Sequence, residues 1–442
     1  MYATEIPFSV RTSHHHQVAG HSRSDAWRRF RRYAVWMRRL LLREADDRWM
    51  TDDIFDRLLA ASTGGLICPT LRSFTCYLTE TNPRFILHFL SPHLTHLTIR
   101  VRPFYHNTTR NFLPDLGPVL QTLPTRCLQE VTIDFGMGGM DHLKSEAVSV
   151  IQRCGHLLRV LSVPIPLGEA AVHHVMELKN LRVWDCVYSP PPTTSPLSAP
   201  FPPLQSLVLG GKDAYGWIPW LVQRERGIPG TGNGPVQRTG LKVTLTHLAF
   251  QESVPINTAF ISPLFLFPNL VTLDVQSNCW SSAGCTFSLA NQDVVQLSAA
   301  LPLLELLELG HQCPYNTCHT TISCFLALSV HCKGLYKLGI HLNATNLIDN
   351  IRSLSEDPNF RDLRSLPTRC PLRYFNIGSQ PFPPGMSSED VTLIAAGFVD
   401  IFPSLLGIHP HTSLGWNLLH SRVRELRGLH TPSLPYHVSP QV

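Results

Sequence analysis

The densest group of candidate metal ligands in the sequence lies around 311-HQCPYNTCHTTISC-324. Thiolate and imidazole groups are the ligands that Zn²⁺ prefers in proteins. Zinc sites usually combine two such pairs at short matched spacings, whereas this segment contains one C-x4-C pair without a second. Cysteine is also common as a small buried residue in repeat cores. The sequence therefore predicts no metal and no other cofactor, although it offers seven candidate ligands: His311, Cys313, Cys318, His319, Cys324, His331 and Cys332.

Other patterns that carry chemistry are weak or absent from the sequence. It contains no G-x-S-x-G elbow, no H-E-x-x-H motif and no kinase motif set. The segment 209-LGGKDAYG-216 lacks the spaced upstream glycine of a phosphate-binding loop. The glycines of 230-GTGNGP-235 have no strand pattern before them and no helix pattern after them, so they indicate a turn. We therefore expect a non-catalytic protein.

Composition and charge narrow the class of protein further. Only 16% of the 442 residues are charged, against about 25% in a typical globular domain, and the 36 prolines indicate many short elements. A net charge of +5 is modest for a chain of this length, so it argues only weakly for a nucleic-acid partner. The twelve scattered cysteines follow no signal peptide, and no apolar run is long enough to span a bilayer. We expect a soluble protein of the cytoplasm, the nucleus or both, with no membrane partner.

A repeated template organises the chain. The pattern L-x-x-L-x-[LVI], or a close variant, recurs eleven times at spacings of 23 to 41 residues between first leucines, and a degenerate last copy begins at Leu405. The fullest form, 267-FPNLVTLDVQSN-278, ends in an asparagine that can satisfy backbone groups where the chain turns. The first leucines of the eleven copies are Leu71, Leu94, Leu128, Leu158, Leu181, Leu204, Leu245, Leu270, Leu304, Leu335 and Leu372.

Helical periodicity fills the segments between copies of the template. A short strand followed by a helix, about every 30 residues, is typical of a leucine-rich-repeat solenoid, in which stacked coils share one core. Two insertions, 189–203 and 227–240, are rich in Pro or Gly and predict loops within the array. We therefore expect an α/β fold: an irregular horseshoe of parallel strands with helices outside. The predicted helices are 143–154, 168–180, 292–302, 321–332 and 387–402, the last capped by Ser387 or Ser388.

An amphipathic segment, 24-SDAWRRFRRYAVWMRRLLL-42, precedes the first copy of the template. An apolar stripe at helical spacing, Trp27, Phe30, Ala34, Met37 and Leu41, is surrounded by arginines. A solenoid needs a cover on its open end, so a helical cap explains the stripe. The alternative is an RNA-binding helix that uses Arg28, Arg29, Arg31 and Arg32. We expect a disordered tail over 1–23, the cap and linker over 24–66, the repeats over 67–410, and a tail over 411–442.

The same amphipathic segment resembles a known family. The run W-x-x-F-x-x-Y-A-x-x-M-R-x-L, then 54-IFDRLLA-60 and 68-CPTLRSFTC-76, is similar to the segment after the F-box in fungal F-box/leucine-rich-repeat proteins. The loose repeats extend the resemblance to about residue 410. No F-box itself is recognisable in the residues before Trp27. The resemblance implies a substrate-binding receptor of an SCF-type (cullin–RING) ubiquitin ligase, with the ligase's adaptor subunit as a partner. A stand-alone repeat scaffold without a ligase is the alternative.

The template also predicts which side chains face a partner. Its third and fifth residues alternate away from the core, because successive side chains of a strand point to opposite faces. These residues are mixed polar with no dominant charge, which suits a protein partner better than a phosphate backbone. The predicted partner-binding residues are His96, Thr98, Glu130, Thr132, Asp185, His247, Thr272, Asp274, Glu308, Lys337, Tyr374 and Asn376.

Overall fold

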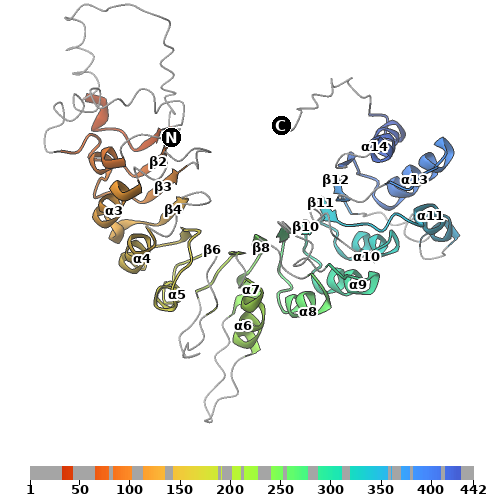
Figure 1. Cartoon of the computed structure of the whole chain (residues 1–442), viewed down its shortest axis with the longest axis horizontal. Coiled ribbons are helices and arrows are strands. Elements are labelled where there is room, and N and C mark those ends of the chain that lie inside the picture. The colour runs from red at the N-terminus through yellow and green to blue at the C-terminus, as the bar shows by residue number, and fades with distance from the viewer. Residues whose placement is uncertain are drawn as a thin grey trace, which may run out of the picture.

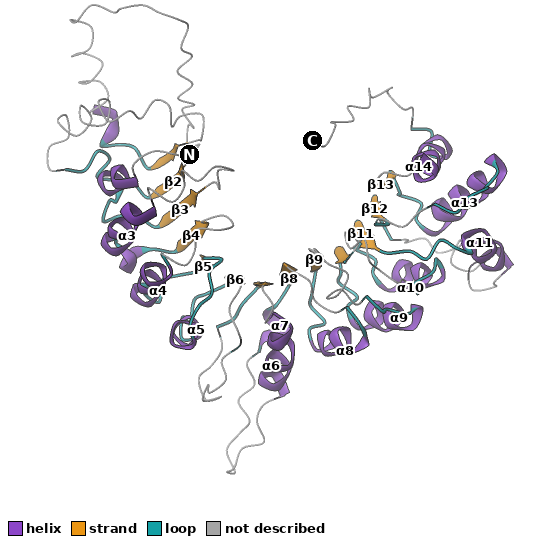
Figure 2. Ribbon diagram, viewed as in Figure 1, coloured by secondary structure: helices purple, strands orange, loops and turns teal. Residues whose placement is uncertain are grey.

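The structure is a computed structural model of the whole chain. It describes residues 32–42, 65–78, 83–101, 113–134, 143–187, 191, 202–210, 214–226, 240–251, 256–276, 287–310, 319–356, 360, 370–378, 382–409 and 414–429. These residues form one parallel sheet of thirteen strands whose spatial order is the order of the chain. The sheet bends into an open arc with the strands along its inner side and the helices outside (Figures 1 and 2). The predicted α/β class and its solenoid-like arrangement are confirmed.

Twelve of the thirteen strands coincide with copies of the template. Each begins two residues after the first leucine of its copy, at the third template position. They are β2 Ser73–Leu78, β3 His96–Val101, β4 Glu130–Asp134, β5 Val160–Ser162, β6 Val183–Val187, β7 Ser206–Gly210, β8 His247–Gln251, β9 Thr272–Gln276, β10 Leu306–Leu309, β11 Lys337–Ile340, β12 Tyr374–Asn376 and β13 Gly407–His409.

The core follows the template. Every first leucine of the eleven copies is fully buried, and so is Leu405 of the degenerate last copy. The fourth position is occupied by large apolar residues, among them Phe74, Trp184 and Phe375, which are also fully buried. Aromatic rings add edge-to-face contacts, such as Trp184 on Trp217 with centroids 5.4 Å apart. Each coil therefore buries its apolar face only by stacking on its neighbours.

Helices cover the outer side of the arc. All five predicted helices are present, within one to four residues of the predicted ends, and further helices fill other connections. The described helices are α3 Leu113–Thr122, α4 Lys144–Arg153, α5 Glu169–Met176, α6 Ala214–Arg226, α7 Leu241–Thr244, α8 Thr258–Ile261, α9 Asn291–Ala300, α10 Ser323–His331, α11 Leu347–Glu356, α13 Ser388–Ile401 and α14 Leu414–Leu426, with the 3₁₀ turns η2 Pro83–Phe89, η4 Thr125–Cys127 and η5 Ser262–Leu266.

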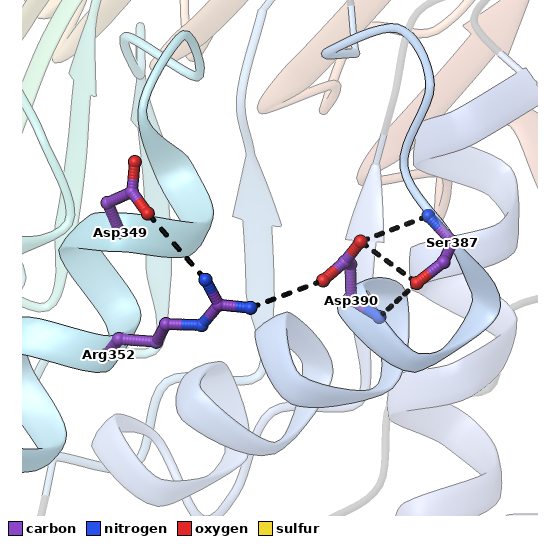
Figure 3. Close-up of polar contacts among 4 residues, drawn as sticks. All are labelled: Asp349, Arg352, Ser387 and Asp390. Carbon is purple, nitrogen blue, oxygen red and sulfur yellow. Dashed lines mark hydrogen bonds and ion pairs between the residues drawn. The ribbon is translucent and has the colours of Figure 1, made fainter.

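The predicted cap of α13 is confirmed at Ser387. Its hydroxyl accepts a hydrogen bond from Asp390 N (3.1 Å), and the Asp390 carboxylate accepts from Ser387 N (3.1 Å) and Ser387 Oγ (2.9 Å). Arg352 of α11 lies 3.7 Å from the same carboxylate and 3.8 Å from Asp349 (Figure 3). The hydrogen bonds from Ser387 hold the pKa of Asp390 below its usual value. The capping box thus also ties α13 to the helix of the preceding coil.

The array continues across both insertions. β6 pairs with β7, and β7 pairs with β8, in the same register as the other strands. The repeats therefore resume on both sides of the two insertions, most of whose residues lie outside the described ranges. Asn278, at the ninth position of the fullest copy, also lies outside the described residues. Asn343 stands at the same position of the copy that begins at Leu335. Asn343 accepts a hydrogen bond from Thr345 N (3.0 Å), so its side chain satisfies a backbone group at the turn as expected.

The amino-terminal helix ends earlier than predicted. Residues 32–34 are helical, but the chain then turns, and Arg39–Leu42 form the edge strand β1. Arg38 O accepts hydrogen bonds from Arg72 N and Ser73 N, so this segment satisfies backbone groups at the edge of β2. Of the predicted stripe, Ala34 is buried and Met37 packs on the core, whereas Leu41 is 46% exposed. Trp27 and Phe30 lie outside the described residues.

The predicted carboxy-terminal tail is wrong over residues 414–426. These residues form α14, which packs against α13 and β13. Trp416, Leu419 and Val423 recur at helical spacing and are fully buried. They cover the last coil, whose apolar surface would otherwise face water.

Candidate functional site

All twelve predicted partner-binding residues lie in two adjacent rows across the sheet. The first row contains His96, Glu130, His247, Thr272, Lys337 and Tyr374. The second contains Thr98, Thr132, Asp185, Asp274, Glu308 and Asn376. Both rows alternate with the buried positions and therefore face the inner side of the arc, away from the helices (Figure 2). We refer to these two rows as the strand face.

The strand face also contains polar residues that the sequence analysis missed. Ser73 and Thr75 of β2, Ser162 of β5 and His409 of β13 stand in the same two rows. The signal was present in the sequence, because 71-LRSFTC and 158-LRVLSV carry these residues at the third or fifth template position. His409 is the fifth residue of the last copy when Leu405 is taken as its first residue.

The amino-terminal section of the strand face, β2 to β6, carries mainly hydroxyl groups. Thr75, Thr98, Thr132 and Ser162 follow one another along the second row. Ser162 donates a hydrogen bond to Asp185 Oδ2 (2.9 Å) at the end of this run. In the first row His96 Nε2 lies 3.5 Å from Glu130 Oε1, and both side chains are more than 40% exposed. This pair is attractive only when His96 is protonated, and water screens it.

The middle section, β7 and β8, interrupts the polar second row. There Val208 and Ala249 stand between Asp185 and Asp274. Both are half-buried, so a narrow apolar strip crosses the strand face with a carboxylate at each end.

The carboxy-terminal section, β9 to β13, contains charges that are partly removed from water. Lys337 Nζ lies 2.6 Å from Glu308 Oε1, and the Glu308 side chain is only 8% exposed. Asp274 Oδ2 accepts a hydrogen bond from Gln276 Nε2 (2.9 Å), whereas its Oδ1 is buried without a hydrogen-bond partner among the described residues. Burial raises the pKa of Asp274, the Gln276 hydrogen bond opposes the shift, and the Glu308 charge adds to it.

Three neighbouring rings lie at the end of the carboxy-terminal section. The Tyr374 ring lies 5.9 Å from the His409 ring, and His420 of α14 lies 6.3 Å beyond. Tyr374 is 42% exposed. Burial lowers the pKa of His409, and the nearby His420 and Lys337 lower it further. His409 is therefore held toward its neutral form beside an accessible tyrosine.

The structure describes four of the seven candidate metal ligands. Residues 311–318 lie outside the described residues, which leaves His319, Cys324, His331 and Cys332 of the predicted group. Within the described ranges, no three Cys, His, Asp or Glu side chains gather as metal ligands would. Cys324 and Cys332 are fully buried, and burial raises the pKa of the Cys332 thiol to about 12. These two cysteines serve as small core residues.

The arginine-rich segment falls mostly outside the described residues. Arg28, Arg29 and Arg31 are among those not described, so the RNA-binding alternative has no structural test here. In the part of the chain that the structure describes, no helix is both long enough and apolar enough to cross a bilayer.

No protein-family model matches this chain, and no curated protein matches it at a significant level.

Proposed function

We propose that this chain is a leucine-rich-repeat solenoid that acts as a non-catalytic protein-recognition module and binds a protein partner on its strand face. The observation that carries the proposal is the unbroken register of the sheet. It brings the third and fifth template positions, most of them polar, into two rows on one face, from strands more than 300 residues apart in the chain. A concave, mixed polar surface of this extent suits a protein segment that contacts several coils at once.

The electrostatics of the strand face support a protein rather than a nucleic acid. Among the described residues of the two rows, four are acidic, namely Glu130, Asp185, Asp274 and Glu308, and two carry a permanent positive charge, Arg39 and Lys337. A surface with two excess negative charges repels a phosphate backbone, although the whole chain has a net charge of +5.

The proposal includes a role in a ubiquitin ligase. In this role the chain is the substrate-binding receptor of an SCF-type assembly, and it holds a target near a ubiquitin-loaded enzyme bound elsewhere. The support is the resemblance of 24–76 and of the loose repeats to F-box/leucine-rich-repeat proteins. The test is affinity purification of the tagged full chain from matched extract, followed by mass spectrometry. Recovery of the cullin adaptor at near-equal stoichiometry is expected, and its absence beside other recovered partners would leave a stand-alone scaffold.

A pair of variants tests the strand face independently of the ligase. Tyr374 on the strand face and Val330 on α10 are similarly exposed, at 42% and 36%. Tyr374→Ala should weaken retention of a co-purified target, because exposed tyrosines often anchor interfaces. Val330→Ala should leave retention unchanged. The opposite result would place the binding surface on the helix side.

A further inference from the structure

The strip across β7 and β8 has the chemical character of a site for a long basic side chain. Val208 and Ala249 are neighbours in the second row, and Asp274 follows directly on β9. Lysine and arginine carry an apolar stem with a charged end, and they bind where apolar surface leads to a carboxylate. The strip therefore suits both parts of such a side chain: Val208 and Ala249 can contact the apolar stem, and Asp274 can bind the charged end.

Asp274 makes no ion pair with any described residue, although the charge of Lys337 opposes the rise that burial causes in its pKa. Glu308 is paired with Lys337 at 2.6 Å, and Glu130 with His96 at 3.5 Å when His96 is protonated. Asp274 instead accepts one hydrogen bond from the neutral Gln276 amide, and its Oδ1 has no partner among the described residues. The side-chain torsion of an aspartate carboxylate is soft, so rotation can turn either oxygen toward the open side.

The neighbours of Asp274 set the direction of approach. On the β10 side Glu308 is occupied by Lys337, whose ammonium group would repel a second cation. On the β8 side stands the small Ala249. A partner's cation therefore reaches Asp274 from β8, along the strip.

We propose that the strand face binds an extended basic segment of a protein partner, with a lysine or arginine stem over Val208 and Ala249 and its charge against Asp274. This inference rests on the proposed function and names the chemistry of the partner. Strands are about 4.8 Å apart, so Val208 and Asp274 are separated by roughly 10 Å. The stem of the basic residue therefore runs across β8 between these two positions.

The test is a selection of random twelve-residue peptides displayed on phage, with the immobilised full chain as bait. Enrichment of Lys or Arg is the expected result. A selected peptide should bind Asp274→Asn at least about tenfold more weakly, because a hydrogen bond to a charged group is lost. The matched control is Asp349→Asn on α11, an exposed aspartate on the helix side, which should bind like the wild type.

A second variant separates lost binding from lost folding. Ala249→Arg places a guanidinium group beside Asp274 within the chain itself. It should therefore abolish peptide binding, while the new ion pair keeps or raises the melting temperature. Peptides without an excess of Lys or Arg, or peptides that bind Asp274→Asn as well as the wild type, would overturn the inference. Recovery of no binding peptide would also overturn it, because an extended segment must bind. None of these results decides the proposed function, which the adaptor and the Tyr374→Ala variant test separately.

Discussion

Two ion pairs on the strand face show how differently its two ends are built. In the amino-terminal section His96 and Glu130 lie 3.5 Å apart with both side chains more than 40% exposed. In the carboxy-terminal section Lys337 and Glu308 lie 2.6 Å apart, and Glu308 is 8% exposed. The first pair is screened by water and adds little to stability, whereas the second holds a carboxylate that has lost most of its hydration.

The difference between the two ends shows where groups suited to binding a partner lower the stability of the free protein. Hydroxyl groups dominate β2 to β5 and remain compatible with water. Around β9 to β11 the sheet instead carries two neighbouring carboxylates and one ammonium group, and one carboxylate oxygen has no partner in the described part of the chain. Partly desolvated charges lower the stability of the free protein, and they become favourable when a partner supplies the missing group. If the strand face binds a protein as we propose, this asymmetry favours its carboxy-terminal section as the main contact.

The largest expected effect comes from removing the cation of the buried pair. Lys337→Met leaves Glu308 without its counter-ion, and we expect a loss of about 2 kcal/mol in the free energy of unfolding, below the full value for a buried pair because Lys337 is 40% exposed. Urea denaturation of the full chain measures it. A loss below about 0.5 kcal/mol would mean that Glu308 is as well hydrated as Glu130.

The second prediction compares the starts of two helices. α13 has the Ser387 cap, whereas α5 begins after Gly168 without a side-chain cap. Ser387→Ala should cost about 1 kcal/mol, and Gly168→Ser should add a few tenths of a kcal/mol, because a serine oxygen can accept from a free N–H of the first turn. Gly168 has a φ of −72°, which serine adopts without strain. Equal and opposite shifts in melting temperature would show that the two helix starts are equivalent.

The third prediction uses pH to isolate Asp274. Because its pKa is raised in the folded protein, ionised Asp274 destabilises the fold above the folded pKa, and this penalty disappears as the pH falls below the unfolded value near 3.8. Asp274→Asn should therefore be more stable than the wild type at pH 7, by less than the Ser387 effect, and the difference should shrink toward pH 4. Asp390→Asn is the opposite case: its pKa is lowered, so the wild type should gain stability over this variant as pH rises. A gain for Asp274→Asn that is constant from pH 4 to 7 would contradict the assignment.

The smallest effect is expected at the exposed pair. Glu130→Gln should change the free energy of unfolding by less than about 0.5 kcal/mol at pH 7, and the change should fall further in 1 M salt. Denaturation at two salt concentrations is the measurement. A salt-independent loss of 1 kcal/mol or more would remove the distinction between the two ends.

The sequence predicted the array because its signal is local and repeated. Leucines at the first position and large apolar residues at the fourth locate each strand, and the alternation of side chains then places both polar rows. It did not reveal β1, because residues 39–42 form a strand only in contact with β2, thirty-four residues later. The residues of α14 show helical spacing at Trp416, Leu419 and Val423. They lie beyond the last copy of the template, so the repeat pattern predicts a tail there and not a helix.

The electrostatics of the strand face could not be read from the sequence. Asp274 and Glu130 occupy equivalent-looking polar positions, yet one is half-buried beside Glu308 and the other is exposed beside His96. The difference depends on neighbours that are 25 to 35 residues away in the chain. The template fixes the strand register and so identifies which residues are neighbours. Side-chain packing then determines which of these residues is desolvated.

The most direct test of the account places a photo-crosslinking amino acid on each side of the solenoid. One variant carries benzoylphenylalanine in place of Tyr374 on the strand face, and the other carries it in place of Val330 on α10. After irradiation in matched extract, we predict that one defined protein is crosslinked through position 374 and not through position 330, and that adding Asp274→Asn reduces the adduct. A protein crosslinked through position 330 alone would contradict recognition by the strand face.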